Sequence, residues 1–147
     1  MSNNDQRLDW ESYFMHMARI TALRSKDPRT KVGAVLVSKE WHVLGTGYNG
    51  FPPGFPDWPE LWTPEHKYDY VVHAEANCLL HSTAGLRSGS GLRLFTTLYP
   101  CKECAKLVLT AGIEELYYLD KYECPIADRL LNHSKSSLKK IVKLEVR

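Results

Sequence analysis

Two short segments of the chain contain the residue types that bind zinc in proteins. A His-Ala-Glu segment stands at residues 73–75, and a Pro-Cys-Lys-Glu-Cys segment stands at residues 100–104. One histidine and two cysteines make three ligands of the kind that zinc prefers, and they leave a fourth tetrahedral position for water, as in catalytic sites. The metal lowers the pKa of such a water to about 7, so a neighbouring carboxylate can take its proton. The pattern predicts a catalytic zinc centre with His73, Cys101 and Cys104 as ligands and Glu75 as the acid/base.

Two other interpretations of the cysteines stay open. Cys101 and Cys104 alone fit a redox-active CxxC pair, which leaves the His-Ala-Glu segment without a role. A closed structural zinc site needs a fourth ligand from Cys78 or Cys124. Cys78 is five positions after His73, about 140° around a helix, so we expect it to face the core. Cys124 is expected to be a small buried residue or a bystander without a role in the site.

The elements around these segments must position the ligands. Apolar periodicity and capping residues predict helices at 10–23, 73–84, 100–111 and 125–131, and strands at 32–37, 43–48, 92–98, 115–119 and 141–146. Both ligand segments then begin helices, where free N–H groups favour thiolate over thiol. Residues 49–63 form a long irregular segment rich in proline and aromatic residues, which we expect to be an ordered, covering loop. An initial hairpin followed by strand–helix units predicts an α/β fold with a mixed sheet and helices on both faces.

The bulk composition limits the classes of protein to consider. The 147 residues suit one domain, at 1–147, and 44% hydrophobic with 24% charged residues is ordinary for a folded soluble protein. A net charge of +2 is too small to argue for a nucleic-acid groove. No apolar run approaches the roughly 20 residues of a membrane span, and the first residues do not form a secretory signal. We expect a cytoplasmic protein without a membrane or nucleic-acid partner.

The chain resembles the deoxycytidylate (dCMP) deaminase family of the cytidine deaminase superfamily over nearly its whole length. The matching segments are 27–34, 47–50 with Pro52 and Gly54, 73–77, 100–106 and 120–122. H-x-E with P-C-x-x-C is the signature of zinc nucleobase deaminases in general. Gly-Tyr-Asn-Gly at 47–50 and Asp-Lys-Tyr at 120–122 narrow the resemblance to dCMP as substrate.

The resemblance implies a fold, a reaction and roles for residues. The fold would be a three-layer α/β/α arrangement around a mixed five-stranded sheet. The reaction would be hydrolysis of dCMP to dUMP and ammonia, which supplies dUMP for thymidylate synthesis. Zn²⁺ would be the cofactor, and Glu75 would carry a proton from water to ring N3 and then to the leaving amine. Asn49 would contact the sugar, and backbone groups near Ala74 and Pro100 would hold the edge of the base.

The residues that bind the phosphate are less constrained. Arg29, Thr30 and Lys31 precede the first strand, and Lys121 and Tyr122 follow the fourth. Arginine offers forked donors to phosphate and lysine a point charge. Each of them could instead belong to a solvated turn. Asn49 could likewise be a turn residue, because Asn-Gly is a common turn dipeptide.

The resemblance also suggests assembly and control. It implies a homo-oligomer, a hexamer, that is activated by dCTP and inhibited by dTTP, with Mg²⁺ accompanying the regulatory triphosphate. Gly47, Tyr48, Asn49 and Gly50 would offer open backbone N–H groups and a flexible turn to that triphosphate. Many phage members carry a regulatory arginine on the helix that begins with His-Ala-Glu, and the later positions of this helix lack one. This departure favours some loss of control and leaves a bifunctional dCMP/dCTP deaminase as an alternative.

Other function classes remain as rivals. A deaminase of tRNA or single-stranded nucleic acid requires a basic channel with aromatic platforms. The loop supplies Trp58 and Trp62, but also the acidic residues Asp57, Glu60 and Glu65. Free cytidine deaminases typically have a cysteine in place of the histidine of the metal triad. The alternative that is not an enzyme is a binding module stabilised by zinc.

Overall fold

A mixed five-stranded sheet forms the centre of the chain. The structure is a computed structural model that describes residues 6–83, 85–86 and 90–146. The strands are β1 Gly33–Val37, β2 Val43–Tyr48, β3 Arg93–Leu98, β4 Glu115–Asp120 and β5 Lys140–Lys143. Their spatial order is β2-β1-β3-β4-β5, with β1 antiparallel to β2 and β3, and β3, β4 and β5 parallel to one another. The mixed five-stranded sheet predicted for this chain is confirmed.

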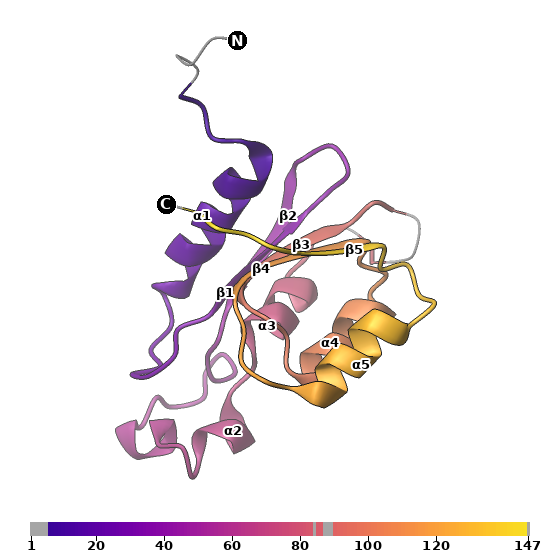
Figure 1. Cartoon of the computed structure of the whole chain (residues 1–147). Coiled ribbons are helices and arrows are strands. Elements are labelled where there is room, and N and C mark those ends of the chain that lie inside the picture. The colour runs from indigo at the N-terminus through magenta and orange to yellow at the C-terminus, as the bar shows by residue number, and fades with distance from the viewer. Residues whose placement is uncertain (1–5, 84, 87–89, 147) are drawn as a thin grey trace.

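Helices cover both faces of this sheet (Figure 1). They are α1 Trp10–Ala22, α3 Ala74–Leu80, α4 Lys102–Thr110 and α5 Pro125–His133, with the short elements η1 Pro59–Trp62 and α2 Lys67–Tyr70 between β2 and α3. The side chains of β1 alternate between two cores. Val35 and Val37 pack with α1, whereas Ala34 and Leu36 pack with α3, α4 and α5. This period of two buries both faces of the strand and produces the three-layer α/β/α fold.

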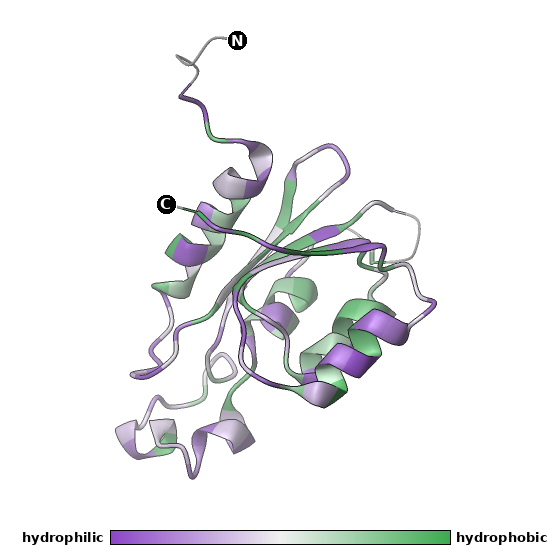
Figure 2. Cartoon of the chain, viewed as in Figure 1, coloured by the Kyte–Doolittle hydropathy of each residue, from purple (hydrophilic) through white to green (hydrophobic). Residues whose placement is uncertain are grey.

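The apolar residues follow this layering (Figure 2). Hydrophobic segments gather in the strands and in the helices that cover them, whereas the loop of η1 and α2 is largely hydrophilic. In the part of the chain that the structure describes, no helix has the length and apolar character needed to cross a membrane.

Several boundaries differ from those predicted, most clearly those of α3, α4 and β5. α3 ends at Leu80 because His81 caps it and the N–H of Thr83 already bonds to Leu44 O on β2. The predicted last residue of this helix, Ala84, lies outside the described residues. The helix predicted from residue 100 begins at Lys102, since Cys101 has extended backbone as its N-cap. β5 covers Lys140–Lys143 rather than 141–146, opposite the first four residues of β4.

The long segment between β2 and α3 is ordered by aromatic contacts. Phe51 stacks on Trp62 with ring centroids 4.1 Å apart, and Phe55 stacks on Tyr70 at 5.3 Å. A β-bridge between Gly50 and Val72 brings the two ends of the segment together. The segment is therefore a closed loop that holds α2 next to the beginning of α3, as Figure 1 shows.

The close approach of α1 to the sheet depends on Gly33. A Cβ atom at this position would lie 2.0 Å from Ala18 O and 2.5 Å from Ala22 N, both backbone atoms of α1. Gly33→Ala is therefore expected to lower the free energy of unfolding by about 1–3 kcal/mol, the usual cost of overpacking. Urea denaturation measures this, with Gly85→Ala as control because nothing lies within 4 Å of a Cβ there. Equal stability of the Gly33→Ala and wild-type proteins would contradict the packing described.

Candidate active site

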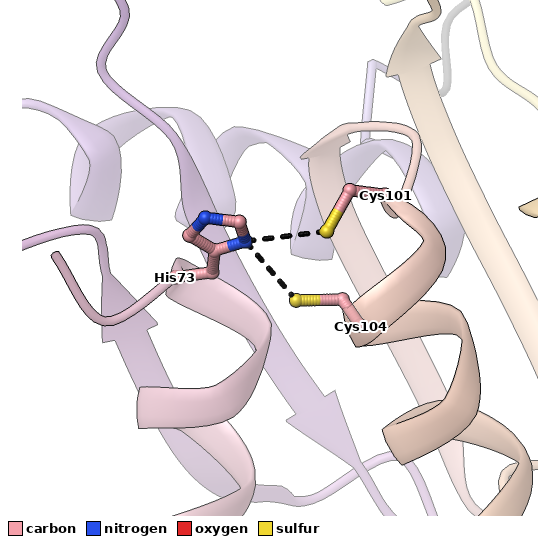
Figure 3. A group of neighbouring side chains, drawn as sticks. All are labelled: His73, Cys101 and Cys104. Carbon is pink, nitrogen blue, oxygen red and sulfur yellow. Dashed lines mark hydrogen bonds between the residues drawn. The ribbon is translucent and has the colours of Figure 1, made fainter. Parts of the chain in front are cut away.

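The three predicted zinc ligands meet between the beginnings of two helices. His73 is the N-cap of α3, Cys101 is the N-cap of α4, and Cys104 lies in the first turn of α4. Figure 3 shows both sulfur atoms pointing toward the imidazole ring. The Nδ1 atom of His73 is 3.4 Å from each Sγ atom, and all three ligand atoms lie within 4.8 Å of one another. The two helices pack side by side on the same face of the sheet, which places their N-termini together.

The spacing of these atoms fits one zinc ion. Zinc binds histidine nitrogen at about 2.0–2.1 Å and cysteine sulfur at about 2.3 Å, so tetrahedral geometry places N and S about 3.5 Å apart. The two measured N···S separations agree with this value. The donor set and its geometry therefore fit Zn²⁺, and three ligands leave one coordination position open.

Hydrogen bonds within the triad shift the pKa values of its three side chains. Cys101 accepts hydrogen bonds from the Cys104 thiol and from His73, which lower the pKa of Cys101 to about 3 against the opposing effect of burial. The hydrogen bond to Cys101, together with burial, raises the pKa of Cys104. The hydrogen bond with Cys101 also raises the pKa of His73. The site thus stabilises a negative sulfur, the form that binds a metal.

The other two cysteines stand apart from this cluster. Cys78 is fully buried in the core beneath β2, with its sulfur 3.4 Å from Gly45 O, and burial raises the pKa of its thiol to about 12. The prediction that Cys78 faces the core is confirmed. Among the described residues, the group of potential metal ligands contains neither Cys78 nor Cys124, so it offers no fourth ligand for a closed structural zinc site. Cys124 is half-buried at the beginning of α5.

Glu75 is buried beside the metal triad. The residue is 4% exposed and lies in the first turn of α3, two positions after His73. Burial raises the pKa of its carboxyl group to about 7, although its own backbone N–H and His73 act in the opposite direction. A carboxyl group with a pKa in this range can both accept and release a proton near neutral pH. A buried carboxyl group beside the triad can therefore exchange protons with a water molecule there.

A cavity of about 140 Å³ opens beside the triad and Glu75. Its walls come from the 27–32 segment, the loop that follows β2, α2, the end of β3, the beginnings of α3 and α4, and the segment after β4. The lining residues are Asp27, Thr30, Val32, Asn49, Lys67, Tyr68, Val71, His73, Ala74, Glu75, Leu98, Tyr99, Cys101 and Tyr122. Segments that are far apart in the sequence therefore build one site around the metal ligands.

The substrate-binding residues predicted from the sequence divide into two groups. Asn49, Ala74, Thr30 and Tyr122 line the cavity. Pro100 does not line it, although its neighbours Tyr99 and Cys101 do.

The two basic residues predicted to hold the phosphate also lie outside the cavity lining. Arg29 is exposed. The ammonium group of Lys31 donates to the backbone carbonyl of Ser25. Neither side chain therefore faces the metal ligands across this cavity.

Asn49 connects the wall of the cavity to the sheet. Its side-chain amide donates to Thr30 O at 2.9 Å and to Asp27 Oδ2 at 3.3 Å, and its Oδ1 accepts from Val32 N at 2.9 Å. Among the described residues, Trp41 is the one non-glycine residue with a positive φ, so Asn49 has ordinary backbone geometry. Asn49 therefore fixes the segment 27–32 against β2 in addition to facing the cavity.

The segment 47–50 differs from its expected form. Gly47 and Tyr48 are the last residues of β2 and pair with β1. The N–H of Asn49 bonds to Val32 O at 3.3 Å and that of Gly50 to Val72 O at 3.0 Å. The expectation of open backbone N–H groups in a flexible turn is thus wrong for Asn49 and Gly50. Their N–H groups already donate hydrogen bonds to Val32 beside the sheet and to Val72 at the closure of the loop. Gly47, Tyr48 and Gly50 do line a second hollow of about 560 Å³.

Sequence reasoning missed a buried ion pair in the cavity wall. Lys67 Nζ donates to Asp27 Oδ2 at 2.8 Å, and the two side chains are 7% and 1% exposed. Burial alone would raise the pKa of Asp27, but hydrogen bonds from Lys67 and from two backbone N–H groups lower it. A lysine in a polar loop is ordinarily a surface residue, so no pattern in the sequence marks it.

Comparisons with known proteins agree with this geometry. Residues 8–120 match the model of the family described as the cytidine and deoxycytidylate deaminase zinc-binding region. A probable deoxycytidylate deaminase of Drosophila melanogaster is 45% identical over 127 residues, which cover 78% of this chain and 62% of that protein. The deoxycytidylate deaminase of Homo sapiens is 39% identical, with 94% of this chain and 83% of that protein covered.

A solved structure gives the same result for the fold. The crystal structure of dCMP deaminase from the cyanophage S-TIM5, in complex with dCMP and dUMP, superposes with a TM-score of 0.76 at 28% identity. The match covers 95% of this chain and 99% of that one. The cluster of one histidine and two cysteines, the buried glutamate and these similarities lead to one conclusion: the chain belongs to the deoxycytidylate deaminase family of the cytidine deaminase superfamily.

Proposed function

We propose that this chain converts dCMP to dUMP and ammonia by hydrolysis. The observation that carries the proposal is the placement of Glu75 and the triad His73, Cys101 and Cys104 against one cavity. The names of the human and Drosophila relatives support dCMP as the substrate, as does the cyanophage neighbour, which was solved with dCMP and dUMP. The product suits a supply of dUMP for thymidylate synthesis, and a cytoplasmic location stays a prediction.

The residues of the cavity have separate tasks in this reaction. When bound by His73, Cys101 and Cys104, zinc supplies a Lewis acid that lowers the pKa of water. Glu75 takes a proton from the attacking water and passes it to ring N3. It then takes the remaining proton of the hydroxyl group added at C4 and delivers it to the exocyclic amine. A C4–O bond forms, the C4–N bond breaks, and ammonia leaves. The buried position of Glu75 supports this task, because burial raises the pKa of the carboxyl group and makes its ionised form a stronger base toward water.

The cavity walls orient the nucleotide for this step. Asn49 is proposed to contact the sugar, and backbone groups near Ala74 and Pro100 to hold the edge of the base. Tyr122, which lines the cavity and is 55% exposed, stays a candidate for contact with the phosphate. Arg29 and Lys31 stay candidates for a phosphate contact from outside the cavity lining.

A substrate panel tests this assignment. Ammonia release is measured with dCMP, dCTP, CMP, deoxycytidine and a cytosine-containing single-stranded oligonucleotide. The proposal expects dCMP to have the highest kcat/KM of the panel. Comparable rates with dCTP would support a bifunctional dCMP/dCTP deaminase, and preference for the oligonucleotide would support a nucleic-acid deaminase.

Assembly and control form a separate part of the proposal. We expect a hexamer that dCTP activates and dTTP inhibits, each with Mg²⁺, through the hollow lined by Gly47, Tyr48 and Gly50. Opposite effects of two nucleotides require each to favour a different arrangement of the site. Light scattering gives the mass, and dCMP saturation curves with and without each effector give the control. Hyperbolic curves unchanged by either nucleotide would remove the control hypothesis and leave the deaminase proposal standing.

A further inference from the structure

Lys67 is a lysine buried within the proposed substrate cavity. The residue is 5% exposed, begins α2, and lines the same cavity as His73 and Glu75. Lysine is rarely buried unless it has a charged partner. Among the lysine and arginine residues in the described ranges 6–83, 85–86 and 90–146, it is the one that lines this cavity. Lys67 is therefore the lysine or arginine side chain that brings a positive charge to the described cavity wall.

The partner of this cation is already saturated with donors. The Asp27 carboxylate accepts from Lys67 Nζ at 2.8 Å and from the Asn49 amide at 3.3 Å. It also accepts from the backbone N–H groups of Arg29 at 2.8 Å and Thr30 at 3.1 Å. Four donors share its negative charge, and at 1% exposure it cannot act as a ligand acceptor in the cavity. Asp27 instead fixes where the ammonium group lies.

The ammonium group of Lys67 has N–H groups available for an acceptor other than Asp27. An ammonium group has three protons, and within the described part of the chain Asp27 Oδ2 accepts one of them. The ring of Tyr68, with its centroid 5.1 Å from Nζ, covers the group on one side. Two protons remain for a ligand that enters the cavity. This is an arrangement suited to an anionic group of the substrate, because N⁺–H···O⁻ bonds are among the strongest hydrogen bonds in proteins.

We propose that Lys67, positioned by Asp27, binds the 5′-phosphate of the nucleotide and thereby selects nucleotide over nucleoside. The inference rests on the proposed dCMP deaminase function, in which the base lies at the metal triad and the phosphate at the other end of the substrate. A phosphate that leaves water needs a cationic partner, since burying an unpaired charge is costly. Lys67 provides it inside the cavity, where Arg29 and Lys31 do not reach the lining.

A purely structural role for the ion pair is the alternative to be separated. Lys67→Met alone leaves Asp27 buried without its partner, which destabilises a protein and reduces every activity. The double variant Asp27→Asn with Lys67→Met removes both charges and avoids this cost. If the pair only supports the fold, the double variant recovers stability and use of dCMP together. If Lys67 binds phosphate, it recovers stability but not the preference for a nucleotide.

The experiment compares ligands with and without phosphate on zinc-loaded protein. Wild type, Lys67→Met, the double variant and Lys67→Arg are tested for binding of the product dUMP and of deoxyuridine by calorimetry. The kcat/KM for dCMP and deoxycytidine, and the melting temperature of each variant, are measured alongside. Lys139→Met is the charge-matched control, because Lys139 is 75% exposed and pairs with Glu114, the residue before β4, and neither residue lines the cavity.

The expected result is a loss confined to phosphate-bearing ligands. Lys67→Met and the double variant should bind dUMP about ten- to a hundredfold more weakly, the range for a hydrogen bond to a charged group. Binding of deoxyuridine by the double variant should change little, Lys67→Arg should recover part of the dUMP affinity, and Lys139→Met should match wild type. The kcat/KM values for dCMP and deoxycytidine should follow the same division.

Other outcomes overturn the inference. Equal losses for dUMP and deoxyuridine in the double variant would assign Lys67 to the fold or to the base and sugar. A phosphate-specific loss in Arg29→Ala, absent from the Lys67 variants, would assign the phosphate to Arg29. Wild-type protein that binds dUMP but deaminates no dCMP would reject the proposed function while the binding comparison still decides the role of Lys67.

Discussion

Glu75→Gln is expected to reduce the turnover of dCMP by about two to four orders of magnitude, the usual range for loss of a general acid–base. Glutamine has nearly the same shape but cannot carry the proton from water to ring N3 and the amine. Because Glu75 is not one of the three metal ligands, zinc content and melting temperature should stay close to those of wild type. Steady-state kinetics with dCMP and metal analysis on the same preparation measure both quantities.

A matched substitution controls for the change in charge. Glu40 is exposed in the turn between β1 and β2, away from the cavity, so Glu40→Gln should leave turnover unchanged. If Glu75→Gln retained most of the wild-type activity, Glu75 would not be the acid/base and the proposed mechanism would be wrong.

Purified protein is expected to contain about one zinc per chain and to lose it when a triad residue is replaced. Cys101→Ser and His73→Ala each remove one of three ligands, so metal content should fall well below one per chain and dCMP turnover should fall to background. Cys124→Ser is the control, because this residue is not in the group of potential ligands and should keep its zinc. Metal analysis by mass spectrometry gives the content independently of activity.

Either of two results would contradict the prediction of one catalytic zinc per chain. Two tightly bound zinc ions per chain would show a second site that the triad does not explain. Full activity in protein stripped of zinc by a chelator would show that the reaction does not use the metal.

Short sequence patterns predicted those helices and strands whose limits depend on interactions between residues close together in the chain. The start of α1 follows from Asp9, whose carboxylate accepts from Ser12 N at 2.7 Å as an N-cap should. β1 follows from a continuous apolar run, and β2 follows from its place after a short turn as the partner of β1. The end of α3 depends instead on a bond between Thr83 and Leu44 of another element, which no window of sequence contains.

In the candidate site, too, residues in short motifs could be predicted, whereas a pair of residues far apart in the sequence could not. Short motifs contain His73, Glu75, Cys101 and Cys104, so the sequence could predict that they lie at two helix N-termini, and the structure brings the three candidate ligands together there. The Asp27–Lys67 pair joins residues 40 positions apart, and its burial arises only when the loop closes through the bridge between Gly50 and Val72. The elements η1 and α2 were missed for this reason, since aromatic stacking within the closed loop orders them.

The most direct test of the central claim is to follow dCMP with zinc-loaded wild-type protein in water enriched in the heavy oxygen isotope. Hydrolysis places one oxygen from water at C4, so mass spectrometry should find dUMP with a single heavy oxygen on the base and an equal amount of ammonia. The Glu75→Gln protein should form this product far more slowly. Unchanged dCMP after prolonged incubation of zinc-loaded wild type, or dUMP without the heavy oxygen, would contradict the assignment of this chain as a hydrolytic dCMP deaminase.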